Sequence, residues 1–389
     1  MTYVANTYNR FDLSFVKGEG CYLFDGTGKK YLDLVAGIAV CALGHNYPEF
    51  TKRLGEQAAK LLHVSNLYKI PPQEKLAKML VERTFADKVF FCNSGAEANE
   101  AAIKLVRRYG YAINTNKVKI LSFFNSFHGR TTGSLSITGQ VKYRKGFGEL
   151  LPNVEFVNFN DKKDLENKFD NSVCGVFVEV IQGEGGINII DKSFLAELRK
   201  LCDKFNAVLV FDEVQTGIGR TGKFFAYEHF GVEPDVLTSA KALGNGIPIG
   251  ALTGKKKFMD VLAPGTHAST FGGNYMATVA GVTLLEIFDE KNILQNVVET
   301  GNYFIEKLFE LKKQFPFVKD VRGLGLMIGI EFDFPVSRIV KSLMEKNILT
   351  VSAGENVLRF VPPLIIGKKD VDFAINTLFK VFKEVENEA

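Results

Sequence analysis

An acid and an amine follow two apolar segments of the sequence. Asp212 ends the run at residues 207–211, and Lys241 follows the run at residues 235–240. Such runs are typical of buried parallel strands, so both side chains should emerge at the carboxyl edge of one sheet, where ligands bind. The amine can form an imine with an aldehyde, and the acid can keep a ring nitrogen protonated. The pair therefore indicates a site for a cationic heteroaromatic cofactor.

The surroundings of Lys241 favour this interpretation over a solvated surface lysine. Segment 239–250 is nearly uncharged and rich in glycine. A lysine at the end of a buried strand is expected to have a lowered pKa, which makes its amine nucleophilic. Asp212 alone could be an ordinary acid at a strand end.

A candidate anion site begins at Ser94, between an apolar run and an amphipathic helix. Ser94 is a good N-cap, and Glu97 completes a capping box three residues later. Gly95 and Ala96 leave backbone N–H groups open, and a helix dipole favours a phosphate there by about 0.3–2 kcal/mol. A well-capped helix with no ligand is the alternative.

Two side chains in the segment F-H-G-R-T (127–131) could contact a ligand. Phe127 could stack on a cofactor ring, and Arg130 could pair with a carboxylate. The alternative is a loop with a buried phenylalanine and a solvated arginine.

Residues 217–222 match G-x-G-x-x-G, the fingerprint of nicotinamide dinucleotide sites. Asp212 and Glu213 precede the match and would crowd a pyrophosphate, and segment 223–230 is too short for the helix that should follow. Asp235 has nearly the expected spacing but begins a strand. We therefore reject this site and expect a loop that approaches the cofactor pocket or only turns the chain.

The overall composition is that of a globular protein. The 389 residues are 46% hydrophobic and 24% charged, with a net charge of +4, which predicts neither a nucleic acid nor a membrane partner. The five cysteines lack C-x-x-C spacing and the five histidines lack ligand spacing, so we expect reduced thiols and no metal. The N-terminal segment has no apolar signal core, which predicts a cytoplasmic location.

The periodicity of the chain predicts an α/β fold with two domains. A hairpin is expected at residues 21–33, around D-G-T-G. From residue 74 helical segments (74–85, 97–109, 193–205) alternate with apolar runs, which predicts a mostly parallel sheet. Beyond residue 285 we expect a helix, one antiparallel strand, a helix, a strand and a helix (302–314, 321–332, 337–346, 357–361, 369–385). We therefore predict a large domain at residues 51–284 and a smaller α+β domain formed by residues 1–50 and 285–389.

Several segments resemble the fold-type I pyridoxal phosphate enzymes, in the subgroup of class III ω-aminotransferases. The resemblance runs nearly end to end and rests on N-S-G-A-E-A-N-E-A-A-I-K (93–104), F-H-G-R-T (127–131), V-I-Q-G-E-G-G (180–186), V-L-V-F-D-E-V-Q-T-G-I-G-R-T-G (208–222) and H-A-S-T-F-G-G-N (267–274). It implies pyridoxal 5'-phosphate as the cofactor. It also implies a homodimer, in which Thr270 reaches the cofactor phosphate of the partner subunit.

The same resemblance implies roles for the other candidate residues. Lys241 would bind the cofactor covalently and Asp212 would pair with its ring nitrogen. The remaining cofactor contacts would be Ser94, Gly95 and Ala96 at the phosphate, Gln215 near the ring hydroxyl, and Phe127 and Val214 on the two ring faces. Arg130, with Ser269 nearby, would bind the distal carboxylate of the amine donor. Arg359 would bind 2-oxoglutarate and pair with Glu184 when that substrate is absent.

The implied reaction is transfer of the terminal amine of N-acetylornithine to 2-oxoglutarate, as in arginine biosynthesis. The products would be N-acetylglutamate 5-semialdehyde and glutamate. Succinylornithine, ornithine, 4-aminobutyrate and carrier-bound lysine remain open as donors. An aminomutase, which needs no 2-oxoglutarate, is a further alternative.

Overall fold

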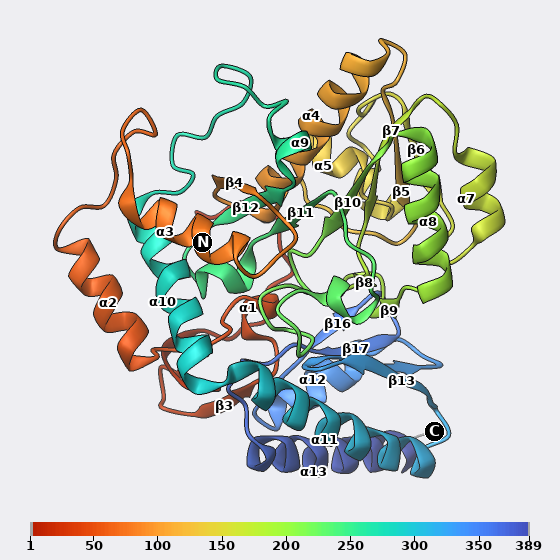
Figure 1. Cartoon of the computed structure of the whole chain (residues 1–389). Coiled ribbons are helices and arrows are strands. Elements are labelled where there is room, and N and C mark those ends of the chain that lie inside the picture. The colour runs from red at the N-terminus through yellow and green to blue at the C-terminus, as the bar shows by residue number, and fades with distance from the viewer. Residues whose placement is uncertain (1–2, 388–389) are drawn as a thin grey trace.

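The computed structural model describes residues 3–387, and a seven-stranded sheet forms its centre (Figure 1). The strand order is β4-β12-β11-β10-β7-β5-β6. β12 is antiparallel to both neighbours, and the other neighbouring pairs are parallel, which confirms the predicted α/β class. The bounds are β4 (Lys88–Cys92), β5 (Lys119–Phe123), β6 (Val154–Val157), β7 (Val173–Val178), β10 (Val208–Asp212), β11 (Val236–Ser239) and β12 (Gly250–Gly254).

Helices cover both faces of this sheet, so its strands are apolar on both sides. Val208 and Val210 of β10 belong to the core cluster that includes α4 (Gly95–Ile113), whereas Leu209 and Phe211 belong to the cluster that includes α8 (Lys192–Phe205). Successive side chains of a strand point to opposite faces, which produces this alternation. The unbroken apolar run before Asp212 is therefore a doubly covered strand.

The C-terminal part forms a second unit, in the lower half of Figure 1. Its sheet has the order β13-β14-β17-β16, and a further sheet, β1-β2-β3-β15, joins the N-terminal hairpin to a C-terminal strand. Both chain ends thus contribute to neighbouring sheets, but the domain limits at residues 50 and 285 stay a prediction. The elements are β1 (Phe15–Glu19), β2 (Tyr22–Asp25), β3 (Lys30–Asp33), α11 (Ile293–Gln314), β13 (Val318–Leu324), β14 (Met327–Phe332), α12 (Ser337–Glu345), β15 (Ile348–Leu349), β16 (Val351–Ala353), β17 (Val357–Phe360) and α13 (Lys368–Asn387).

The expected single strand at 321–332 is wrong, because the segment folds back on itself. Leu324 of β13 pairs with Met327 of β14, and Gly325 between them has φ 55°. A Cβ at Gly325 would lie 2.5 Å from the backbone of Thr221. A left-handed turn in so narrow a space requires glycine, and the apolar run hid this turn.

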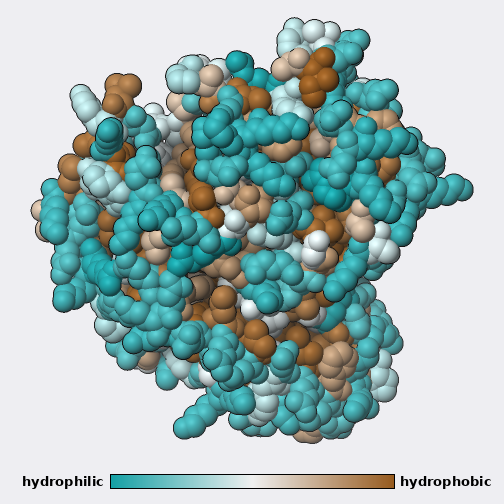
Figure 2. All heavy atoms as spheres, in the orientation of Figure 1, coloured by the Kyte–Doolittle hydropathy of each residue, from teal (hydrophilic) through white to brown (hydrophobic). Residues whose placement is uncertain are grey.

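In the part of the chain that the structure describes, no helix combines the length and apolar character needed to cross a membrane. Figure 2 shows a face that is mostly hydrophilic, with hydrophobic residues in smaller groups between the hydrophilic ones.

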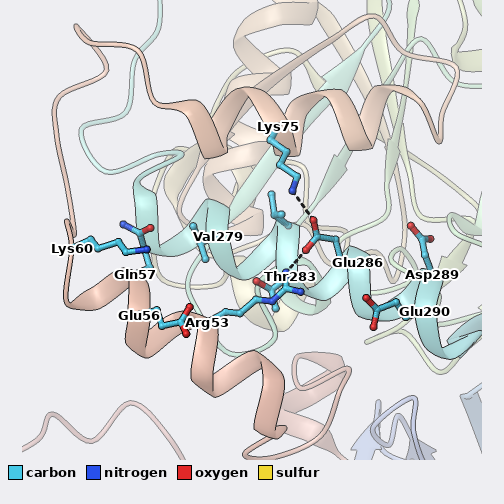
Figure 3. Close-up of a pocket in the computed structure, with 11 residues that line it drawn as sticks. Arg53, Glu56, Gln57, Lys60, Lys75, Val279, Thr283, Glu286, Asp289 and Glu290 are labelled. Carbon is cyan, nitrogen blue, oxygen red and sulfur yellow. Dashed lines mark hydrogen bonds and ion pairs between the residues drawn. The ribbon is translucent and has the colours of Figure 1, made fainter.

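Three helices at the left of Figure 1 enclose a charged hollow of about 690 Å³ (Figure 3). They are α2 (Pro48–Ala58), α3 (Pro71–Val81) and α10 (Tyr275–Lys291). Glu286 of α10 forms ion pairs with Arg53 of α2 and, at 2.6 Å, with Lys75 of α3. Burial opposes ionisation, but the hydrogen bonds from Lys75 and Arg53 lower the pKa of Glu286 overall. One carboxylate therefore ties three helices together.

Replacing Glu286 with glutamine should lower the free energy of unfolding by about 1–2 kcal/mol at pH 7. Because the folded pKa of Glu286 is lowered, its contribution is present above the unfolded pKa and is lost as the pH falls through the folded value. Urea unfolding at several pH values should show the difference from wild type vanish in acid. Glu290→Gln is the control, since Glu290 lines the same hollow without an ion pair among residues 3–387.

Candidate active site

Asp212 and Lys241 share a cavity of about 390 Å³ at the carboxyl edge of the central sheet. β10 and β11 are parallel neighbours, and Asp212 pairs in register with Thr238. Asp212 ends β10, and Lys241 lies two residues beyond the end of β11. The two side chains therefore meet at one edge, as the two apolar runs predict.

A network of hydrogen bonds fixes the Asp212 carboxylate, which is 5% exposed. Its Oδ2 accepts a hydrogen bond from Asn99 Nδ2 at 2.8 Å and lies 2.7 Å from His128 Nδ1. Its Oδ1 accepts from the Val214 backbone N–H at 3.0 Å. Asn99 is itself held, because its Oδ1 accepts from the Thr238 hydroxyl at 2.9 Å. The acid is thus a preorganised acceptor that can stabilise a positive charge in the cavity.

The Lys241 amine has the electrostatic setting of a nucleophile. Burial lowers its pKa below the ordinary lysine value, and the charge on Arg359 lowers it further, against the opposing effects of Glu184 and Asp212. A larger fraction of the amine is then neutral at physiological pH. Lys241 also has φ 45°, a left-handed conformation that is uncommon for residues other than glycine.

Open N–H groups at the start of α4 border the cavity. Ser94 caps the helix, since its Oγ accepts from the Glu97 N–H at 3.1 Å. The predicted capping box is corrected in one respect: the Glu97 carboxylate accepts from the N–H of Asn93, at 2.5 Å. Gly95 and Ala96 donate their N–H groups to no acceptor within residues 3–387. Together with the helix dipole, these donors suit a phosphate.

The side chain of Val214 explains why glycine occupies position 95. A Cβ there would lie 2.7 Å from Val214 Cγ1, which is closer than such contacts allow. Val214 and Phe127 both line the cavity, where each can contact a flat ring. The Phe127 ring in turn packs edge-on against Tyr143, with centroids 5.7 Å apart.

The guanidinium of Arg359, on β17, is fully buried in the wall of the site. Its Nη1 donates to Glu184 Oε1 at 2.5 Å, to Gln215 Oε1 at 3.1 Å and to the Gly183 carbonyl at 3.1 Å. Burial opposes ionisation of Glu184, but the charge and hydrogen bond of Arg359 lower its pKa overall. Glu184 therefore covers the buried Arg359 guanidinium in a partly buried ion pair.

Arg130 differs from Arg359, because it is exposed and has no carboxylate partner within residues 3–387. It lines the Lys241 cavity, and its guanidinium lies 3.8 Å from the centroid of the Tyr143 ring. This cation is free to bind an incoming carboxylate.

Ser269 and Thr270 are not brought to the Lys241 cavity within one chain. They line a separate hollow of about 360 Å³ with His267 and Phe271. The Ser269 hydroxyl accepts from Asn93 Nδ2 at 3.2 Å and from the Gly272 N–H at 3.0 Å. Their roles beside a substrate or a partner's cofactor stay predictions.

The glycine-rich loop at 217–222 lies outside the cavity, since none of its residues lines it. Arg220 in this loop is fully buried, and its Nη1 donates to the carbonyls of Pro362, at 2.6 Å, and Leu326, at 3.0 Å. The loop therefore turns the chain and anchors the C-terminal unit, which agrees with the second of the two expected roles.

The polar residues Asn99, His128 and Glu179 also line the cavity, and the sequence alone assigned them no role. Asn99 and His128 hold Asp212 from segments far away in the sequence, so no local pattern identifies them. Glu179 follows β7 and is 6% exposed. Its signal was available, because a single acid interrupts the apolar run at 175–181.

The chain is similar to known proteins over nearly its whole length. Residues 3–382 match the family model of class-III aminotransferases. An acetylornithine aminotransferase of Aquifex aeolicus is 48% identical, with 98% of this chain and 100% of that protein covered. The structure of an ornithine aminotransferase of Toxoplasma gondii, with pyridoxal phosphate at partial occupancy in its active site, has a TM-score of 0.94 at 33% identity. The match covers 99% of this chain and 93% of that one. An N-acetylornithine aminotransferase of Stenotrophomonas maltophilia has a TM-score of 0.86 at 35% identity, covering 98% of each chain.

Proposed function

The chain belongs to the class-III aminotransferase family, and we propose that it transfers the terminal amine of N-acetylornithine to 2-oxoglutarate. The observation that carries the proposal is the contrast between two arginines near Lys241. Among residues 3–387 Arg130 has no carboxylate partner, whereas Arg359 is covered by Glu184. A donor with one distal carboxylate needs only Arg130, and an acceptor with two carboxylates needs both Arg130 and Arg359. The full-length likeness to acetylornithine aminotransferases supports the same donor.

We infer that the cofactor is pyridoxal 5'-phosphate, because the donors and acceptors of the cavity suit its parts. The unpaired N–H groups of Gly95 and Ala96, beside Ser94, suit the phosphate, and the fixed Asp212 carboxylate suits the ring nitrogen. Gln215 would face the ring hydroxyl, and Phe127 and Val214 the ring faces. When bound, this cofactor supplies an aldehyde and an electron-withdrawing ring.

The protein residues would divide the work of the reaction. Lys241, with its lowered pKa, takes a proton from the substrate carbon and returns it as a general base and acid. Asp212 would keep the ring nitrogen of the bound cofactor protonated. Arg130 orients the distal carboxylate, so that the terminal amine faces Lys241. For 2-oxoglutarate, the α-carboxylate replaces Glu184 on Arg359, so the buried guanidinium keeps a carboxylate partner.

We also infer a homodimer, in which Thr270 completes the site of the partner subunit. Thr270 lines a hollow that does not contain Lys241 of the same chain, which is compatible with that role.

Substrate comparison tests the proposal. The purified protein with 2-oxoglutarate should show its highest kcat/KM on N-acetylornithine, against succinylornithine, ornithine and 4-aminobutyrate. A higher value on ornithine would favour the activity of the Toxoplasma gondii relative. Turnover without 2-oxoglutarate would indicate an aminomutase and refute the proposal.

Replacing Arg359 with lysine should raise the KM for 2-oxoglutarate by about 10-fold, because an ammonium cannot make the paired hydrogen bonds of a guanidinium. The half-reaction with N-acetylornithine should change by less than about 3-fold, since that donor has no carboxylate beside its reacting carbon. Single-turnover kinetics with each substrate separate the two effects. Equal loss in both half-reactions would contradict the role of Arg359.

A further inference from the structure

Glu179 connects two loops that border the cavity. Its Oε2 accepts a hydrogen bond from the Phe127 N–H at 2.9 Å, and its Oε1 accepts from the Gly183 N–H at 3.3 Å. Phe127 follows β5, whereas Gly183 follows β8 (Ile181–Gln182). Each carboxyl oxygen thus holds a different loop by its backbone.

Each of these loops leads to one of the two arginines. On one side, the Arg130 guanidinium lies 5.5 Å from the centroid of the Phe127 ring. On the other side, the Gly183 carbonyl accepts from Arg359 Nη1 at 3.1 Å. Gly183 is therefore held by Glu179 at its N–H and by Arg359 at its C=O. The next residue is Glu184, the ion-pair partner of Arg359. A continuous series of contacts therefore runs from Arg130 through Glu179 to Arg359.

We propose that Glu179 is a positioning residue that sets the spacing between the two arginines to which the substrate carboxylates bind. The inference rests on the proposed function, because it takes Arg130 and Arg359 as carboxylate receptors. Burial and the charge on Asp212 raise the pKa of Glu179 well above its ordinary value, whereas the two backbone N–H groups oppose that effect. The two backbone N–H groups that Glu179 accepts satisfy both oxygens of this buried group.

Glutamine is the informative substitution, because it keeps the size of Glu179 but offers only one acceptor oxygen. Its NH2 group would face one of the two backbone N–H donors, and that loop would lose its anchor. Glu213→Gln is the matched control. Glu213 is also buried and accepts the N–H groups of Ala226, at 2.9 Å, and Tyr227, at 2.8 Å, but it does not line the cavity.

Two measurements test the inference. In Glu179→Gln, hydrogen exchange of segments 124–131 and 181–186 should accelerate by about 10-fold in at least one of them. The KM values for N-acetylornithine and 2-oxoglutarate should both rise by about 10-fold, with kcat within about 3-fold of wild type. Glu213→Gln should accelerate exchange around residues 225–228 and leave both KM values within about 2-fold.

Unchanged KM values in Glu179→Gln, or an equal rise in Glu213→Gln, would overturn the inference. If Glu179→Gln does not fold, Glu179→Asp replaces it, since the shorter carboxylate cannot reach both loops and should raise both KM values similarly. An inactive wild type would refute the proposed function instead, while the exchange data would still decide whether Glu179 anchors the two loops.

Discussion

Replacing Lys241 with alanine should reduce amine transfer by about 10⁴-fold or more, because one side chain is both the nucleophile and the proton carrier. Its amine shares the cavity with Asp212, and its lowered pKa supplies the neutral form. Steady-state assays with N-acetylornithine and 2-oxoglutarate measure the loss. Lys200→Ala, on the exposed face of α8, should stay within about 2-fold of wild type.

A second readout separates binding from chemistry in the same variant. After borohydride reduction, wild-type peptides containing Lys241 should carry the added mass of the cofactor, and the variant should carry none. Phosphate binding at Gly95 and Ala96 should persist, so the variant should still retain cofactor noncovalently. Near wild-type turnover in Lys241→Ala would remove the basis of the proposed mechanism.

The sequence predicts that Asp212 and Lys241 meet, because one rule of sheet geometry places both. Asp212 and Lys241 each follow an apolar run, and parallel strands deliver their carboxyl ends to one edge. Ser94 was predictable in the same way, because a cap and its helix are close in sequence. Local patterns therefore suffice for strands, caps and the residues directly after them.

Contacts between distant segments could not be predicted in this way. Asn99 and His128 lie 113 and 84 residues from Asp212, and only the folded sheet brings them to its carboxylate. Apolar content likewise hid the turn at Gly325, which depends on how closely the backbone of Thr221 approaches. The resemblance supplied Arg359 and Glu184, and the structure shows that they form a partly buried ion pair.

Asp212→Asn should lower kcat by about 10²–10³-fold, because an amide cannot stabilise positive charge on the ring nitrogen. The carboxylate is a fixed acceptor for Asn99 and Val214 and touches His128, so the amide's NH2 group would also face a donor. Single-turnover rates with N-acetylornithine measure the effect. The visible absorbance of the bound cofactor should remain, since Lys241 and the helix terminus are untouched.

Asp235→Asn is the control. It shows whether activity depends on a negative charge at the position of Asp212 or falls whenever a buried acid of the sheet is lost. Asp235 lies just before β11, at the edge opposite Lys241, where it pairs with Arg199 at 3.1 Å and accepts the Leu209 N–H at 2.9 Å. Its loss should reduce stability while kcat stays within about 3-fold. If the two variants lost activity equally, the effect would be structural. If Asp212→Asn alone were slow, the negative charge would be required at the cavity end of β10.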